Sequence, residues 1–128
     1  MVDKRRVDAA ASRPDQGYIS HRWRFLPVVD KEIDQLSEED VVGLHAQMKI
    51  VQRDGLRAAR HLDEDIYEVE AHGIDNSYRL LFSSEGRKGR ILLAVVLHEK
   101  HTQKTPPRVI ALAKKRRDQW RAQGESLT

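Results

Sequence analysis

A single stretch of this sequence, from Tyr78 to Pro107, gathers cationic and imidazole side chains at the end of an apolar segment. The residues that could carry chemistry there are Arg79, His98, Lys100, His101 and Lys104. Arginine and lysine bind phosphate oxygens, and histidine exchanges protons near neutral pH. RNA can be cleaved with such groups alone, because its own 2′-hydroxyl attacks the adjacent phosphate once the backbone is oriented and the developing charge is neutralised. The residue types are therefore those of metal-free phosphate chemistry.

The same side chains have a simpler interpretation, a solvated strand end, which spacing alone favours. Other chemistries have less support. The sequence contains no cysteine, no Gly-rich phosphate loop and no Gly-x-Ser-x-Gly nucleophile turn. His98 and His101 lie three residues apart with Glu99 between them, but no further ligand is fixed near them by the pattern. We therefore expect neither a metal site nor a cofactor.

Charge is distributed unevenly along the chain, although the formal net charge is only +3. From Asp30 to Glu70 there are twelve Asp and Glu against five Lys and Arg, whereas from Arg87 to Gln123 there are eleven Lys and Arg against two acids. A basic second half predicts a polyanionic partner such as nucleic acid, and a solvated basic helix face explains it about as well. The further candidates for phosphate contacts in this half are Arg87, Arg90, Lys114 and Arg117.

Length and composition predict one folded domain. The chain has 128 residues, of which 34% are charged, and no apolar run approaches the roughly 20 residues that span a bilayer. Residues 1–17 lack periodicity and are expected to form a flexible arm, and residues 18–124 to form the domain. The basic N-terminus has no signal-like apolar segment behind it and cysteine is absent, so we expect a cytoplasmic protein.

Periodicity predicts the elements that would position the candidate side chains. Residues 18–26 alternate in polarity, which is typical of a strand, and Pro27 ends it. Residues 28–36 and 37–54 have apolar positions at helical spacing, with Ser37 as an N-cap and Gly55 as a C-terminal stop. These two helices would form a helical hairpin, to which we assign no chemistry.

The second half predicts three strands and a helix. After a loop or short turn at residues 56–65, Ile66–Ala71 alternates between an apolar side and an acidic side. Strands at Tyr78 and Ile91 would pair with it in an antiparallel meander, and Pro107 would begin a helix that runs to Gln123. The predicted fold class is α+β: a small, mostly antiparallel sheet built from a strand and a three-strand meander, with the helical hairpin between them and a C-terminal helix.

The segment from Leu62 to Gln119 resembles the HigB branch of the RelE/ParE toxin superfamily, which includes the phage Gp49-like proteins. That family has a Tyr-Glu-Leu-Arg strand, a Tyr-Arg strand ending in Phe, an apolar strand running into a Lys-Thr-Pro segment, and a helix with Ala-Lys-x-Arg. The corresponding segments here are IYEVEA, YRLLF, LLAVVLHEKHTQKTPP and ALAKKR. The Tyr-Arg strand and the Lys-Thr-Pro ending, at this separation, carry the resemblance, which implies a RelE-like fold.

The resemblance implies a toxin of a type II toxin–antitoxin module, acting as a ribosome-dependent, metal-independent mRNA endoribonuclease (an mRNA interferase). Its partners would be a HigA-like helix-turn-helix antitoxin and mRNA on the ribosome, with no membrane. Carried over by position, Arg79 and Lys104 would bind phosphate and stabilise transition-state charge, and Lys100 would make a further phosphate contact. We expect Arg79→Ala and Lys104→Ala to remove toxicity without disturbing the fold.

The chain departs from the family pattern at three positions. Glu70 stands where the family has an arginine, and an acid there would repel phosphate. His101 replaces a lysine and could act as a general acid or base. His98 replaces a phenylalanine and could be a packing residue. His72, in the turn after Ala71, is a further candidate of low weight.

Two hypotheses remain open at this point. The first is the mRNA interferase, favoured by the His- and Lys-rich strand end. The second is a non-catalytic protein of the same fold that binds and inhibits a protein target, or an inactive phage-derived relic, and Glu70 favours it. In either case we expect the basic face to belong to the antitoxin interface, because an acidic segment could cover it.

Overall fold

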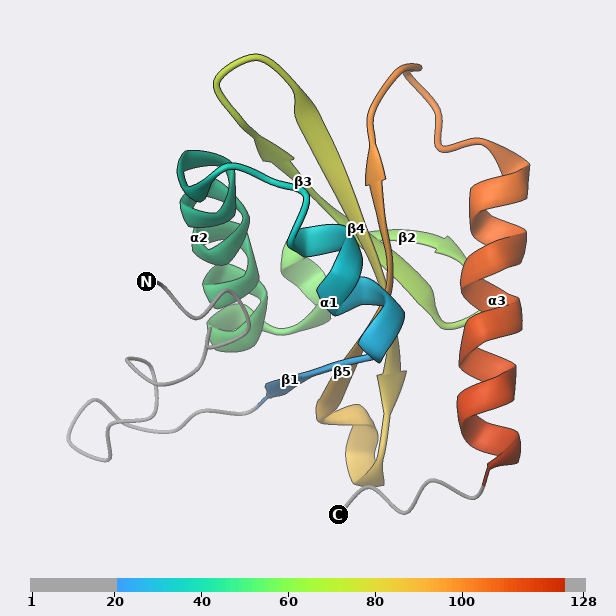
Figure 1. The fold of residues 1–128 in the computed structure, drawn as a ribbon. Coiled ribbons are helices and arrows are strands. Elements are labelled where there is room, and N and C mark those ends of the chain that lie inside the picture. The colour runs from blue at the N-terminus through green and yellow to red at the C-terminus, as the bar shows by residue number, and fades with distance from the viewer. Residues whose placement is uncertain (1–20, 124–128) are drawn as a thin grey trace, which may run out of the picture.

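The structure, a computed structural model, describes residues 21–123, so the predicted N-terminal arm and the first residues of the predicted strand 18–26 lie outside the described residues. The strands are β1 (Arg22–Phe25), β2 (Arg60–Asp63), β3 (Ile66–His72), β4 (Ser77–Glu85) and β5 (Ile91–Glu99). The helices are α1 (Pro27–Ile33), α2 (Glu38–Asp54) and α3 (Pro107–Ala122), and short 3₁₀ turns cover Leu56–Ala58 and Arg87–Gly89. Figure 1 shows the sheet between α1 and α2 on one side and α3 on the other.

The strands form one mixed sheet in the order β1-β5-β4-β3-β2. β1 runs parallel to β5, and the remaining neighbours are antiparallel. The meander of β3, β4 and β5 agrees with the prediction, and so does the α+β fold class, which is compatible with a RelE-like fold. β1 and β5 can run parallel because a long stretch of chain separates them, which begins with the helical hairpin and continues through β2, β3 and β4.

Both faces of the sheet are buried. On one face the apolar side chains of α1 and α2 pack over Trp23, Leu80 and Phe82. On the other face α3 covers a second cluster that includes Leu81 and Leu93. Successive residues of β4 and β5 therefore serve different cores, which explains why these strands are apolar at nearly every position instead of alternating.

The ends of α2 form as the sequence predicts. The Ser37 hydroxyl accepts a hydrogen bond from the Asp40 amide at 3.2 Å, and Gly55 follows the helix with a φ of +84° that favours glycine. Asp40 also accepts hydrogen bonds from the Ile74 amide at 3.1 Å and the Tyr78 hydroxyl at 3.0 Å. The first turn of α2 thus holds the β3–β4 turn at one end of the sheet.

One prediction about the middle of the chain was wrong. The predicted loop at residues 56–65 contains β2, which pairs with β3 through a register shift between His61 and Asp63. The side of β3 that the alternation identified as acidic is covered in the structure, where Ile66 and Glu68 are buried. α3 and the loop that precedes it cover this face, and a single strand's alternation does not reveal what packs above it.

We expect Phe82→Ala to lower the free energy of unfolding by about 3–5 kcal/mol, because it removes a fully buried ring and leaves a cavity. The ring packs edge-on against Trp23, with centroids 4.9 Å apart. Chemical denaturation monitored by circular dichroism would measure the change. The control is Val42→Ala, which truncates a side chain that is 63% exposed on α2 and should change stability by less than about 0.5 kcal/mol. A similar loss in both variants would contradict this assignment of the core.

Candidate functional site

The candidate site lies where β5 leaves the sheet and the chain crosses to α3. Ser77 and Glu99 stand at the same end of the β4–β5 pair, and the Lys100 amide donates to the Ser77 carbonyl at 2.8 Å. Residues 100–106 then form the crossing loop, and Pro107 begins α3. The loop contains the Lys-Thr-Pro segment that the sequence singled out, and Figure 1 shows it bridging from the end of β5 to the start of α3.

Arg79 of β4 holds this loop against the sheet. Its guanidinium donates to the carbonyls of Thr102 and Gln103, each at 2.6 Å, and to that of Lys104 at 3.5 Å. The side chain is 1% exposed. Arg79 was predicted to contact phosphate, but in this structure its donors face the protein backbone. A direct phosphate contact would require the loop to move away from it.

Glu68 supplies the charge that a buried arginine needs. Its Oε1 lies 3.6 Å from Arg79 Nε, and both side chains are buried. Its other oxygen accepts a hydrogen bond from the Thr105 hydroxyl. Buried charges are tolerated in proteins when they are paired and hydrogen-bonded. Glu68, Arg79 and Thr105 therefore form one anchor that fixes the loop against the sheet.

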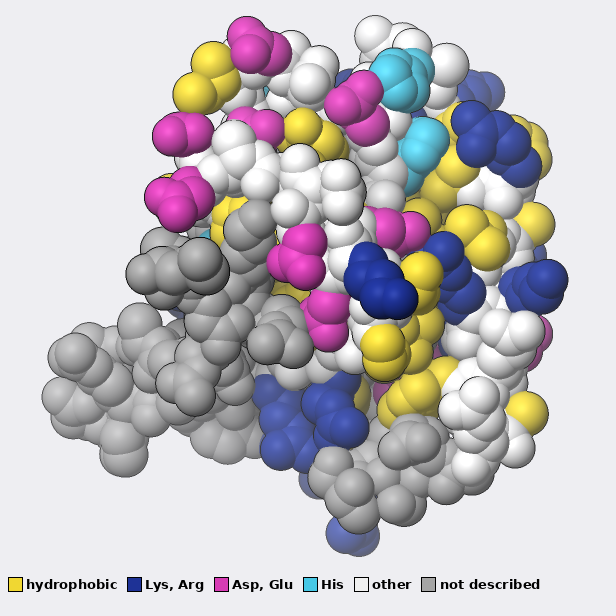
Figure 2. Space-filling view, viewed as in Figure 1, with side chains coloured by type: hydrophobic (Ala, Val, Ile, Leu, Met, Phe, Trp, Pro, Cys, Tyr) yellow, Lys and Arg dark blue, Asp and Glu magenta, His cyan; other side chains and the backbone are white. Residues whose placement is uncertain are grey.

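The anchored loop presents side chains of the predicted site to solvent. Lys104 and His101 are exposed, and His101 Nε2 lies 3.1 Å from a Glu99 oxygen. The His98 and His101 rings meet edge to face, with centroids 6.3 Å apart. Figure 2 shows histidine side chains at the surface over this end of the molecule. The structure thus brings together His98, Lys100 and His101, with Lys104 on the same loop.

A polar hollow of about 450 Å³ lies beside these residues. Its walls are the β3–β4 turn, through Asn76 and Ser77, and the crossing loop, through Lys100, His101 and Gln103. Amide, hydroxyl, ammonium and imidazole groups therefore converge on one space, together with the carboxylate of Asp75. This combination suits a polar ligand better than an apolar one.

Glu70, the departure that raised doubt about phosphate binding, has a partner. Lys100 Nζ lies 2.5 Å from a Glu70 oxygen, and the hydrogen bond from Lys100 lowers the pKa of Glu70. The acid at this position is therefore neutralised locally, but Lys100 is engaged as well. His72, at the neighbouring strand end, is exposed and its Nδ1 lies 2.9 Å from the Ser77 hydroxyl.

A bulge in β5 decides which side chains share this surface. The β4–β5 register shifts between Leu81 and Phe82, which pair with Val96 and Ala94 and leave Val95 without an opposite residue. A one-residue shift moves every later side chain to the other face. As a result His98 stands opposite Arg79 on the α3 side of the sheet. Glu70, which also pairs with Arg79, lies on that side too.

The remaining basic candidates lie elsewhere. Arg87 and Arg90 flank the turn at the opposite end of β4 and β5. Each of these strands has nine residues, which corresponds to about 25–30 Å from the crossing loop at roughly 3.3 Å per residue. The structure does not bring Arg87 and Arg90 to the site that contains Lys104.

Lys114 and Arg117 attach α3 to the sheet instead of forming an open basic surface. Lys114 pairs with Asp63 and Glu64, and Arg117, which is buried, pairs with Glu64 and Asp65. Two further cations of α3 are also engaged, Arg116 with Glu32 and Arg121 with Asp65 and Glu85. Phosphate could reach these side chains only in competition with the carboxylates. The sequence identified these residues as basic. Their carboxylate partners belong to β2 and the acidic turn after it, so only the tertiary structure reveals the pairing.

The described residues 21–123 contain neither a cluster of metal ligands nor a membrane-spanning helix. Among them, no three His, Cys, Asp or Glu side chains converge as a metal site would require. Within the same range, every helix is too short or too polar to cross a bilayer.

Arg79→Ala is expected to destabilise the fold by about 3–5 kcal/mol, because it leaves the Glu68 carboxylate buried without its partner. The crossing loop would also lose the donors that hold its carbonyls. This revises the expectation that Arg79→Ala leaves the fold intact. Thermal and chemical denaturation would measure the loss, with exposed Arg57 changed to Ala as the matched control. Wild-type stability in Arg79→Ala would show that the anchor is not needed.

We expect the imidazole of His98 to titrate below its ordinary pKa of 6.5. Burial lowers the pKa, and the positive charges of Arg108, Arg79 and His101 lower it further. Since the unfolded chain binds this proton more readily, the contribution of His98 to stability falls as pH drops below about 6.5. An NMR titration of the ring protons would give the value, and Arg108→Ala should raise it by removing one of these charges. An unchanged midpoint in Arg108→Ala would contradict the proposed cause.

A family model described as "Phage derived protein Gp49-like (DUF891)" matches residues 31–118, which is well over half of the chain and spans α2 through most of α3. No curated protein matches the sequence. The family model includes both the anchor residues and the crossing loop. The chain therefore belongs to the Gp49-like family of phage-derived proteins, the HigB/RelE-like family of toxins from toxin–antitoxin modules.

Proposed function

We propose that this toxin is a ribosome-dependent mRNA endoribonuclease, and that the crossing loop between β5 and α3 carries its active site. The observation behind the proposal is the buried clamp of Arg79 on three successive carbonyls of that loop. Binding and catalytic residues are found disproportionately on loops that a rigid scaffold holds in position. The clamp presents Lys104 and His101 to solvent in a fixed geometry, next to a polar hollow.

The chemistry that these side chains support is transfer within the RNA backbone. The 2′-oxygen forms a bond to the adjacent phosphorus, and the bond from phosphorus to the 5′-oxygen breaks. The 2′-hydroxyl proton must leave and the 5′-oxygen must gain one, and the exposed imidazole of His101 is suited to one of these transfers. The ammonium of Lys104 stabilises the charge that develops on the phosphate oxygens. The products are a 2′,3′-cyclic phosphate and a 5′-hydroxyl.

Arg79 and Lys100 take different roles in this proposal. Arg79 is a positioning residue, because its guanidinium binds the loop backbone and does not reach solvent. Lys100 orders the strand end through Glu70 and contacts phosphate only if it exchanges partners. His98, whose pKa is lowered by burial and by nearby cations, is more often neutral and can accept a proton.

The antitoxin is proposed to be a HigA-like helix-turn-helix protein that silences the toxin. The second hypothesis, a protein that blocks a target without cleaving RNA, is favoured by one observation. Several cations that would bind RNA are already paired with carboxylates, namely Lys100, Lys114 and Arg117. The two hypotheses differ in whether new RNA ends appear.

Inducible expression in a bacterial host, with mapping of mRNA 5′ ends, distinguishes them. We expect growth arrest, new cuts within translated codons, and at least a tenfold loss of cleavage in Lys104→Ala and in His101→Ala, because each removes a group that acts on the phosphate. Both side chains are exposed, so the variants should fold normally. Lys49→Ala, an exposed lysine on α2, is the matched control and should keep full toxicity.

Each alternative predicts a different result in the same experiment. Arrest without new RNA ends would support a blocked protein target and contradict the endoribonuclease. No arrest at all would indicate an inactive relic. Cleavage of free RNA at the same rate with and without ribosomes would contradict the ribosome dependence, and retained cleavage in both variants would place the active site elsewhere.

A further inference from the structure

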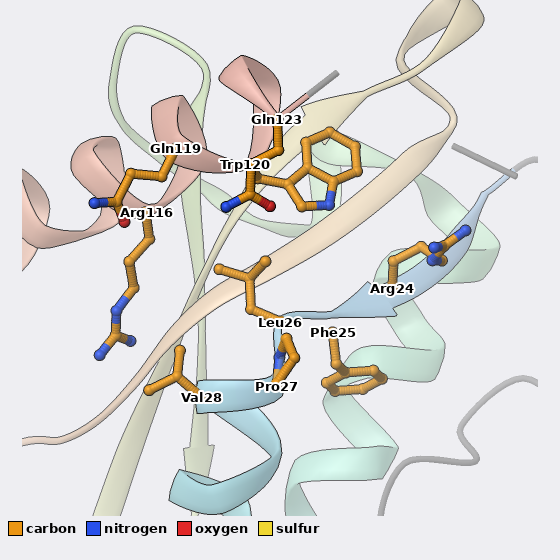
Figure 3. Close-up of a pocket in the computed structure, with 9 residues that line it drawn as sticks. All are labelled: Arg24, Phe25, Leu26, Pro27, Val28, Arg116, Gln119, Trp120 and Gln123. Carbon is orange, nitrogen blue, oxygen red and sulfur yellow. The ribbon is translucent and has the colours of Figure 1, made fainter. Parts of the chain in front are cut away.

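A groove of about 680 Å³ lies between the β1–α1 corner and the second half of α3. It shares no lining residue with the polar hollow. Its apolar lining comes from Phe25, Leu26 and Val28 on one wall and from Trp120 on the other. Figure 3 shows the Leu26 side chain directed toward Trp120 across the groove. Neither the proposed cleavage chemistry nor the anchor of the crossing loop uses these residues.

The walls of this groove are fixed before any partner binds. Arg116 of α3 lies 3.2 Å from Glu32 of α1 and donates to the Val95 carbonyl of β5 at 2.8 Å. The Leu26 amide donates to the Ala94 carbonyl at 3.3 Å, and both Leu26 and Trp120 pack against the buried cluster under α3. A preformed site loses little conformational entropy on binding.

Exposed apolar surface continues from the groove along α3. Leu112 is 37% exposed and precedes Arg116 and Trp120 by four and eight positions, so the three share one helix face. On the opposite wall Val28 is 36% exposed. Figure 2 shows hydrophobic side chains gathered between α1 and α3 and flanked by Lys and Arg. Aromatic and arginine side chains around an exposed apolar strip are typical of protein interfaces.

The charged residues around the groove favour a partner surface of opposite charge. Among the described residues that line the groove, Arg24 and Arg116 are cationic and none is Asp or Glu, but the charge of Arg116 is already balanced by its ion pair with Glu32. Arg22 is exposed and lies on the same side of β1 as Arg24, because side chains alternate along a strand. Lys115 is exposed on α3, one turn before the lining residue Gln119. An apolar strip with this rim complements apolar side chains flanked by carboxylates.

We propose that this groove binds an amphipathic helix with an acidic polar face, contributed by the antitoxin. A helix fits because the apolar strip follows α3 from Leu112 to Gln123, about 17 Å at 1.5 Å per residue, and a partner helix can lay its apolar face along it. The identity of the partner rests on the proposed toxin function. The chemistry of the groove does not depend on it.

The position of the groove has a consequence for inhibition. Trp120 lies thirteen residues beyond Pro107, where the crossing loop ends, so the two are about 20 Å apart along α3. A helix confined to the groove leaves Lys104 and His101 open. Anchoring the antitoxin and covering the active site are then separate tasks for separate segments of the partner.

The test is an NMR titration of the full-length, ¹⁵N-labelled chain with a synthetic 14-residue helical peptide. One peptide has leucines on one face and glutamates on the other, and a matched peptide has lysines in place of the glutamates. We expect the acidic peptide to shift the amides of the β1–α1 corner and of the second half of α3. Its Kd should be at least tenfold lower than that of the lysine peptide, and it should rise with salt.

Matched variants connect the binding to the groove. Val28→Asp places a carboxylate at the exposed edge of the groove and should weaken binding of the acidic peptide at least tenfold. Val42→Asp makes the same change at the exposed site on α2 and should leave the Kd unchanged. Both sites are at the surface, so circular dichroism should show that both variants fold.

Several results would overturn the proposal. These are no amide shifts at millimolar peptide, shifts confined to other surfaces, equal affinity for the lysine peptide, or an unchanged Kd in Val28→Asp. If Leu127→Ala in the free chain shifts the groove amides, the chain's own C-terminal segment occupies the groove and the proposal is also wrong. A chain that binds the acidic peptide but causes no growth arrest would contradict the toxin function and keep the groove assignment.

Discussion

The ion pair between Glu68 and Arg79 is the interaction on which the arrangement of the site depends. Each partner is nearly inaccessible to water, so neither could remain charged there alone. Through Arg79 the pair fixes three loop carbonyls, and through Glu68 it fixes Thr105. The Lys-Thr-Pro segment is thus tied to the sheet by its backbone and by its threonine, while its lysine is left at the surface. Arg79 matches the position of a phosphate-binding arginine in the family resemblance. In this structure it instead holds the backbone of the loop that would carry the chemistry.

A second constraint is the pairing of the acidic and basic parts of the chain. The acidic turn after β2 and the carboxylate of Glu85 meet the cations of α3, so much of the charge imbalance along the sequence is neutralised within the fold. The carboxylates of Glu64 and Asp65 are partly exposed, so their pairs contribute modestly to stability, whereas Glu85 is buried. Together they orient α3 on the sheet. An acidic antitoxin segment would therefore bind this helix face less strongly than the sequence suggests. The apolar groove along the second half of α3 is the alternative contact surface.

Much of the fold was predictable, because hydrophobic periodicity and end signals are local. Ser37 and Gly55 bound α2 as their chemistry requires, and Pro27 and Pro107 each begin a helix. β2 was missed because its sequence, RHLD, has almost no apolar residue, and it exists as a strand only through pairing with β3. The burial of the acidic side of β3 also depends on residues distant in the chain. Glutamate is normally exposed, and Glu68 is buried only because Arg79 and Thr105 meet it there.

The sequence by itself determined the residue types at the end of β5, the order of the elements other than β2, and the family. These depend on composition, short-range spacing and motif. The tertiary structure decided which of the candidate residues meet. A one-residue bulge at Val95 turns His98 toward the α3 side of the sheet, opposite Arg79. An ion pair that spans β4 joins Lys100, just after β5, to Glu70 of β3. Strand register and the pairing of buried charges are properties of neighbours distant in the chain. No local pattern therefore distinguishes the buried Arg79 from the exposed Lys104.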